Sequence, residues 1–183
     1  MSPRKASTFL LLAALVVLGC RGARAQGRRA SPHERTPTAT IDGSQMFIEY
    51  GRPYTRGRTI FGSLVRWDDV WCPGADEATY LSTSLPILVS NLKLPAGKYS
   101  LWIQPSEDVW TLIFNSDWDT FHTNHRSRLD VGKVPMQKET LPSNVEQLTF
   151  TIEPNAGAPG GRIAMSWATT RVSVPFVVGR DIQ

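Results

Sequence analysis

The sequence predicts an all-β protein, with a single antiparallel β-sandwich or jelly-roll-like domain over residues 38–176. Short apolar or alternating segments recur at intervals of roughly 8–12 residues, and Gly, Pro, Asn and Asp separate them, as in sandwiches and barrels. Residues 59–65 are the exception, because the spacing of Ile60, Phe61, Leu64 and Val65 predicts one short helical turn. No other segment sustains the 3.6-residue period of an amphipathic helix.

The first two strands are predicted at residues 38–41 and 46–50, on either side of Asp42-Gly43. A two-residue hairpin turn of type I′ needs positive φ at both central residues, which Asp and Gly tolerate well. The sequence therefore predicts a tight β-hairpin here.

The remaining strands are predicted from the same pattern of short apolar or alternating segments. Residues 85–94 predict one or two strands, and residues 145–153 and 162–174 alternate and complete the domain. Residues 98–104 and 109–114 are apolar at both odd and even positions. Because successive side chains of a strand point to opposite faces, these two are expected to be central strands covered on both sides.

The N-terminal segment predicts export. Residues 1–25 carry Arg4 and Lys5, an apolar run at residues 9–18 and a small-residue exit, the pattern of a signal peptide. Two exits are open. Ala23-Arg24-Ala25 suits cleavage before Gln26, whereas Val17-Leu18-Gly19-Cys20 resembles a lipobox, with the signal ending at residue 19 and Cys20 lipidated.

We expect a periplasmic or extracellular protein that is anchored to a membrane only if Cys20 is lipidated. Residues 26–37 are expected to form a polar leader, and residues 177–183 a C-terminal tail. Cleavage of residues 1–25 removes Cys20 and lipidation modifies it, so Cys72 has no partner for an intramolecular disulfide in either case.

The net charge of the mature chain argues against a nucleic-acid partner. The full chain has 20 basic and 16 acidic residues, but residues 1–25 hold four of the basic ones and no acid. The mature chain is thus neutral, and no polyanion partner is predicted. Arg52, Arg56 and Arg58 form a local basic cluster.

Motifs of established chemistry are missing. The sequence has no nucleophile elbow, no phosphate-binding loop and no dinucleotide-binding glycine pattern, so neither a cofactor nor a catalytic set is predicted. His122 and His125, with Asp117 and Asp119 upstream, have the composition of a metal site. They fall in a polar loop, where neither helical nor strand geometry fixes the relative direction of the two imidazole rings. No metal site is therefore predicted, and His122 and His125 are the only candidates for one.

The six tryptophans divide by their surroundings. Trp102, Trp110 and Trp167 lie in strand-like runs and are expected in the core. Trp67, Trp71 and Trp118 lie in loops, where an exposed ring binds sugars or peptides by stacking.

From Ser31 onward the chain resembles a bacterial family catalogued as domain of unknown function 2911. The motifs that carry the resemblance are Ser31-Pro32-His33-Glu34, Ile48-Glu49-Tyr50-Gly51-Arg52-Pro53, residues 56–65, Val70-Trp71, residues 74–79, residues 94–101, residues 110–115 and residues 167–176. The resemblance implies an exported β-domain and assigns no activity. Where relatives have Trp-Arg-Thr-Gly, this chain has Trp71-Cys72-Pro73-Gly74.

Residue chemistry and resemblance select the same ligand-binding candidates, namely Tyr50, Arg52, Arg58, Trp71, Asp76 and Glu77. Arginines, acids and an aromatic wall suit a ligand with carboxylate or hydroxyl groups. Three hypotheses stay open. The first is a non-catalytic module for a small polar ligand, glycan, peptide or partner protein. The second is a hydrolase with Glu49 or Glu77 as acid or base and Arg52 and Arg58 orienting the substrate. The third is a purely structural domain in which these residues form a buried network.

Overall fold

The computed structural model describes residues 31–179. These residues form ten strands and one 3-10 turn, η1: β1 (His33–Arg35), β2 (Ala39–Ile41), β3 (Ser44–Gly51), β4 (Tyr80–Thr83), β5 (Ile87–Val89), β6 (Leu92–Leu94), β7 (Gly97–Gln104), β8 (Trp110–Asn115), η1 (Ser127–Leu129), β9 (Asp130–Pro154) and β10 (Gly161–Val178). The predicted signal peptide, with Cys20, lies outside the described residues. Within residues 31–179, no helix has the length and apolar character needed to cross a membrane.

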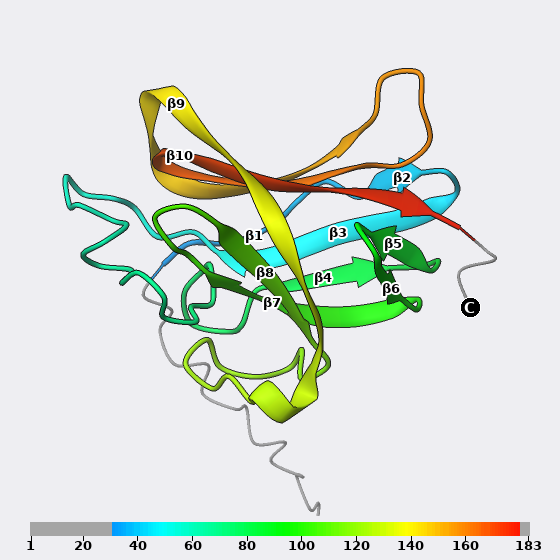
Figure 1. The fold of residues 1–183 in the computed structure, drawn as a ribbon, viewed down its shortest axis with the longest axis horizontal. Coiled ribbons are helices and arrows are strands. Elements are labelled where there is room, and N and C mark those ends of the chain that lie inside the picture. Colours follow the sequence, from blue (N-terminus) through cyan, green and yellow to red (C-terminus); the bar gives the residue numbers. More distant parts are fainter. Residues whose placement is uncertain (1–30, 180–183) are drawn as a thin grey trace, which may run out of the picture.

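All of these strands pair antiparallel in one sheet, in the order β1-β3-β4-β7-β8-β9-β10-β5-β6, with β2 also paired to β3. The long strand β9 pairs with β8 through Asp130–Met136 and with β10 through Gln137–Pro154. Figure 1 shows β9 and β10 above the layer of β3, β4, β7 and β8. The all-β class and the antiparallel pairing are confirmed. A sandwich of two separate sheets is not, because β9 continues from one layer into the other.

The predicted hairpin is confirmed. Ala39–Ile41 of β2 pairs with Ser44–Met46 of β3, and Asp42 and Gly43 have φ of 48° and 82°. Both central residues thus adopt the left-handed conformation that a type I′ turn requires.

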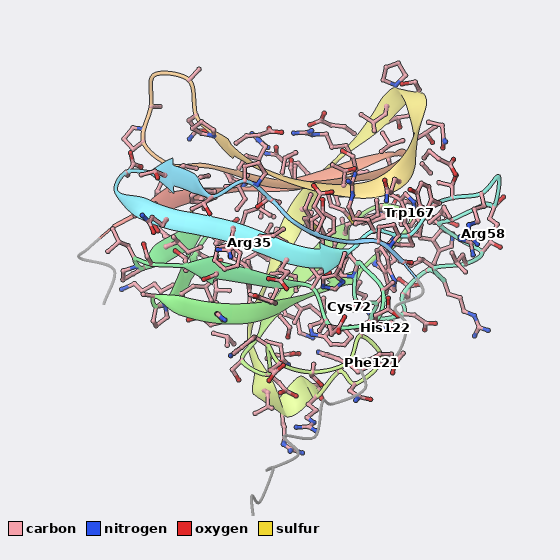
Figure 2. The ribbon with its side chains drawn as sticks, turned by 180° about the vertical axis from the view of Figure 1, so that it is seen from behind. Arg35, Arg58, Cys72, Phe121, His122 and Trp167 are labelled. Atoms are coloured by element: carbon pink, nitrogen blue, oxygen red, sulfur yellow. The ribbon has the colours of Figure 1, made fainter. Side chains whose placement is uncertain are left out.

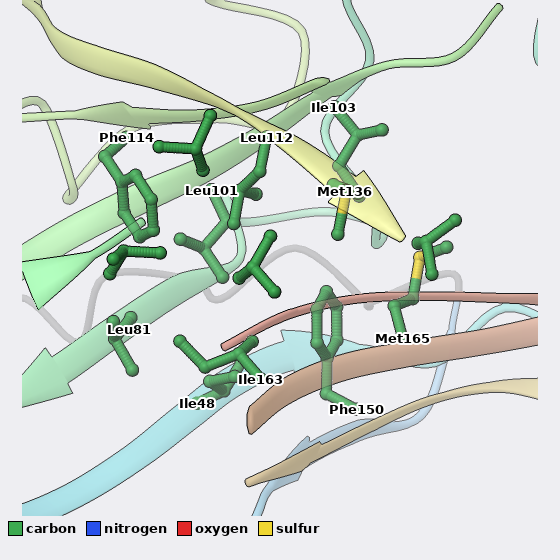
Figure 3. Close-up of a cluster of buried hydrophobic side chains, with 14 of the residues drawn as sticks. Ile48, Leu81, Leu101, Ile103, Leu112, Phe114, Met136, Phe150, Ile163 and Met165 are labelled. Atoms are coloured by element: carbon green, nitrogen blue, oxygen red, sulfur yellow. The ribbon is translucent and has the colours of Figure 1, made fainter. Parts of the chain in front are cut away.

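The core fills the space between the two layers. In Figure 3, Ile48, Leu101 and Phe114 from the lower layer lie near Phe150 and Ile163 of β9 and β10, and all five are buried. The opposite face of β7 and β8 is covered by the connection between β3 and β4, residues 52–79.

This second covering is a small apolar cluster. Trp102 of β7 and Ile113 of β8 pack there with Cys72 and Ala78 of the 52–79 connection. β7 and β8 are therefore covered on both faces, which confirms the prediction for residues 98–104 and 109–114.

The helical turn predicted for residues 59–65 is wrong. Val65 N donates to Ile60 O at 2.9 Å, Gly62 N donates to Val65 O at 2.8 Å, and Gly62 has a φ of +81°, which no α- or 3-10 helix contains. The apolar spacing reflects a tight turn whose Ile60 and Val65 side chains are buried. The helical turn that does form, η1, lies in the connection between β8 and β9.

The described strands extend beyond the predicted domain ends. His33–Arg35, inside the segment expected to be a polar leader, pairs with Glu49–Gly51 of β3 as strand β1. β10 continues to Val178, two residues into the expected tail, where it pairs with Ile87 of β5. Both segments are polar or short, so the sequence pattern alone does not mark them as strands.

Candidate functional site

A large cavity lies where two irregular connections meet, residues 52–79 and residues 116–129. Its volume is about 710 Å³. The lining residues come mainly from these connections, with one tryptophan each from β7 and β10: Ser31, Pro53, Tyr54, Arg56, Arg58, Leu64, Val65, Arg66, Asp69, Val70, Trp71, Cys72, Gly74, Ala75, Trp102, His122, Thr123, His125 and Trp167. Figure 2 shows Trp167, Arg58, Cys72 and His122 toward the same end of the molecule, away from Arg35.

Tryptophans form the apolar wall of this cavity. The Trp71 and Trp167 rings stack with centroids 5.9 Å apart and planes at 14°, and Phe61 forms a T-shaped contact with each of them. Two backbone hydrogen bonds with Ile103, of 2.8 and 2.7 Å, hold Trp71 against β7. The wall is therefore fixed before any ligand arrives, and Trp71 stays partly accessible.

Cationic groups line the mouth. Arg56, Arg58 and Arg66 are exposed, and Asp69 is the one acid among the described lining residues. Arg58 is positioned by two bonds, from Nε to Thr55 O at 2.9 Å and from Nη2 to Tyr54 O at 2.7 Å. The carboxylate of Glu146 lies beside this cluster, where it accepts from Thr55 Oγ1 and Arg56 N, but it does not line the cavity. Among the lining residues, three guanidinium groups against one carboxylate favour an anion.

His122 and His125 both line the cavity, and each ring is anchored at one nitrogen. His122 Nδ1 lies 2.7 Å from the backbone oxygen of Asp76, and His125 Nε2 lies 2.8 Å from Asp130 Oδ1. Within residues 31–179, no group of three or more His, Cys, Asp or Glu side chains is arranged to hold a metal ion.

Cys72 lies in the wall as an inert thiol. Its side chain is 1 % exposed and its Sγ accepts a 3.3 Å hydrogen bond from Thr79 N. Burial raises the pKa of the Cys72 thiol from 9.0 to about 12, against the smaller opposing effect of the Thr79 hydrogen bonds. A thiol held neutral in this way is a poor nucleophile.

We therefore expect stability to fall at alkaline pH. The raised pKa means that the folded state keeps a proton that the unfolded state loses, so the free energy of unfolding decreases as pH rises from about 9 toward 12. The expected loss between pH 9 and pH 10.5 is about 2 kcal/mol from this group, measured by urea unfolding at each pH. Cys72→Ala should flatten the slope, and an unchanged slope would contradict the assignment.

Two of the six predicted ligand residues, Arg58 and Trp71, line the cavity. Tyr50 and Arg52 instead belong to a network that ties β3 to β9. Phe150 N donates to the buried Tyr50 hydroxyl at 3.1 Å, and burial raises the pKa of Tyr50. Arg52 pairs with Glu34 and donates to Leu148 O at 3.0 Å and to Thr149 Oγ1 at 2.9 Å.

Asp76 and Glu77 do not act together. Asp76, in the left-handed conformation with φ of 66°, presents its backbone oxygen to His122, and its carboxylate accepts from Ser31 N at 3.3 Å. Glu77 lines a second cavity of about 250 Å³, and its Oε2 lies 3.7 Å from His33 Nδ1.

Glu49 lines this second cavity as well. Tyr80 donates to Glu49 Oε2 at 2.9 Å, and burial, with this bond, raises the pKa of Tyr80 to about 12. Neither Arg52 nor Arg58 lines the second cavity, so the convergence that the hydrolase hypothesis requires is absent from the described residues.

Sequence reasoning missed part of the site. Trp102 and Trp167 are buried as expected, yet both also line the cavity, which strand alternation gives no means of detecting. Arg66 belongs to no motif. Arg56 belongs to the local basic cluster that the sequence does show, and this cluster is the sequence feature that indicates the cationic side of the cavity.

Comparison with known proteins identifies a family and no activity. A family model described as "Protein of unknown function (DUF2911)" matches residues 31–176. Searches of curated proteins and of solved structures found no match.

Proposed function

Because the chain belongs to the DUF2911 family, whose description names no activity, we propose a function from the cavity itself: the protein is an exported binding module for a small anionic ligand with a flat apolar face. The observation that carries this proposal is the stacked Trp71–Trp167 wall beside three arginines in one cavity.

The size and the lining of the cavity support binding of a small molecule. A volume of about 710 Å³ falls within the range of ligand sites, which is roughly 300–1,000 Å³. An accessible indole face stacks on an aromatic ring or on the C–H face of a sugar. A guanidinium group recognises a carboxylate through two parallel hydrogen bonds.

Binding is proposed rather than catalysis because the acids of the hydrolase hypothesis lie elsewhere. Glu49 and Glu77 line the second cavity, and the thiol of Cys72 is buried and neutral. The purely structural hypothesis accounts for Tyr50 and Arg52 but not for an accessible cavity with a stacked tryptophan pair in its wall.

Calorimetric titration of the mature protein tests the proposal. We expect 2-naphthoate, a flat carboxylate, to bind at least tenfold more tightly than the neutral 2-naphthylmethanol. Arg58→Met and Trp71→Ala should each weaken 2-naphthoate binding about tenfold or more. Arg128→Met and Trp118→Ala are the matched controls, because neither residue lines the cavity, and both should bind normally.

The proposal fails if the acid and the alcohol bind equally, if neither binds, or if Arg58→Met and Trp71→Ala behave like their controls.

A further inference from the structure

We infer that the ligand of the large cavity bears hydroxyl groups as well as its negative charge, and is therefore an acidic sugar of the uronic-acid type. The inference rests on the proposed function and adds the chemical class of the ligand. It follows from the hydrogen-bonding state of the two histidines in the cavity wall.

The proton on His122 is assigned by its partner. The Asp76 backbone oxygen accepts from His122 N at 3.0 Å and lies 2.7 Å from His122 Nδ1. A carbonyl oxygen has no proton to give, so Nδ1 is the donor of this bond. In a neutral imidazole only one nitrogen carries a proton, so His122 Nε2 is an acceptor.

The same logic applies to His125 with the nitrogens exchanged. Its Nε2 lies 2.8 Å from Asp130 Oδ1, and a carboxylate also only accepts. Asp130 is itself fixed, because Asn115 Nδ2 donates to it at 2.8 Å and Lys133 Nζ lies 3.7 Å away. When the His125 ring is neutral, its acceptor is therefore Nδ1.

Both rings line the cavity, and no described residue forms a hydrogen bond with His122 Nε2 or His125 Nδ1. The ring faces are already packed, His122 against Phe121 and His125 against Trp102, with centroids 4.5 and 4.8 Å apart. The rings are therefore oriented, and a ligand meets them in a set position.

The cavity therefore offers two different kinds of hydrogen-bonding group to a single ligand. The arginines at the mouth offer only donors and need an anion, whereas the imidazoles offer acceptors and need an O–H or N–H group. A cationic amine is disfavoured beside three guanidinium groups, which favours hydroxyl over ammonium donors. A uronic acid has a carboxylate, several hydroxyls and a C–H face that stacks on Trp71. A hydroxyl-free carboxylate offers these two acceptors no donor of its own.

The test compares trigalacturonate with the same oligomer after O-methylation of its hydroxyls, each titrated into the intact mature protein by calorimetry. We expect about tenfold or greater loss of affinity on methylation, because the donors are gone while the charge remains. His122→Phe and His125→Phe should each weaken trigalacturonate binding about tenfold, and should weaken binding of 2-naphthoate, which has no hydroxyl group, by a clearly smaller factor. His125→Gln, whose amide oxygen accepts, should recover part of the loss.

The outcomes separate this inference from the proposed function. Equal affinity for the native and methylated oligomers overturns the hydroxyl inference, as does an equal effect of the histidine variants on trigalacturonate and 2-naphthoate. In both cases binding of 2-naphthoate keeps the proposed function intact. If no anionic ligand binds, the proposed function itself is overturned.

Discussion

Gly51→Ala is expected to lower the free energy of unfolding by about 3 kcal/mol or more, because the new methyl group would clash with backbone atoms, which cannot move aside as a side chain can. A Cβ at Gly51 would lie 2.3 Å from Ala75 O and 2.9 Å from Ala75 N. Both are backbone atoms of the 52–79 connection, and they have no rotamer to change. Urea unfolding followed by tryptophan fluorescence measures the loss.

Gly57→Ala is the matched control in the same connection. Gly57 has a φ of +69°, and a Cβ there meets nothing within 4 Å, so the substitution should cost only about 1 kcal/mol for the left-handed backbone. The close approach at Gly51 also positions Gly74 and Ala75 in the cavity wall. A Gly51→Ala protein that folds should therefore bind 2-naphthoate more weakly, and equal stability of the two variants would refute the close-packing argument.

The strands could largely be predicted because their causes are local. The hairpin at Asp42-Gly43 depends on two adjacent residues. The burial of residues 98–104 follows from apolar side chains at both odd and even positions of the strand. The middle of β9 could not be found in this way. Residues 137–144 alternate poorly and are mostly exposed, and their extended conformation depends on pairing with β10, far along the chain.

Only part of the candidate site could be predicted, because the position of its side chains also depends on contacts between distant segments. Arg52 and Arg58 look alike in sequence, as polar residues beside glycines in a loop. Which of them faces a cavity depends on β9, whose Leu148 and Thr149 engage Arg52 and leave Arg58 at the mouth. In sequence, His122 and His125 have the composition of a metal site, but it is the 52–79 connection that places them beside the tryptophan wall.

Arg52→Met is therefore expected to change stability and not binding. The variant loses the ion pair with Glu34 and leaves the Leu148 carbonyl and the Thr149 hydroxyl without the donors they have now. Unpaired acceptors in a partly buried position make the expected loss about 2–3 kcal/mol in the free energy of unfolding. Its affinity for 2-naphthoate, measured by calorimetry below the unfolding transition, should stay within about twofold of the original protein.

Arg58→Met is its counterpart, because the two substitutions remove the same group from the same connection. Arg58 is exposed, and of its two backbone acceptors Thr55 O keeps a second donor, the Arg58 backbone N at 3.0 Å, so the stability should shift by about 0.5 kcal/mol at most. Its affinity for the anion should fall about tenfold. Opposite behaviour of the two variants would assign the ligand to the Tyr50–Arg52 network instead of the cavity. Loss of stability in both would mean that both arginines of the 52–79 connection hold the fold together, and unchanged affinity in Arg58→Met would mean that the anion is recognised elsewhere.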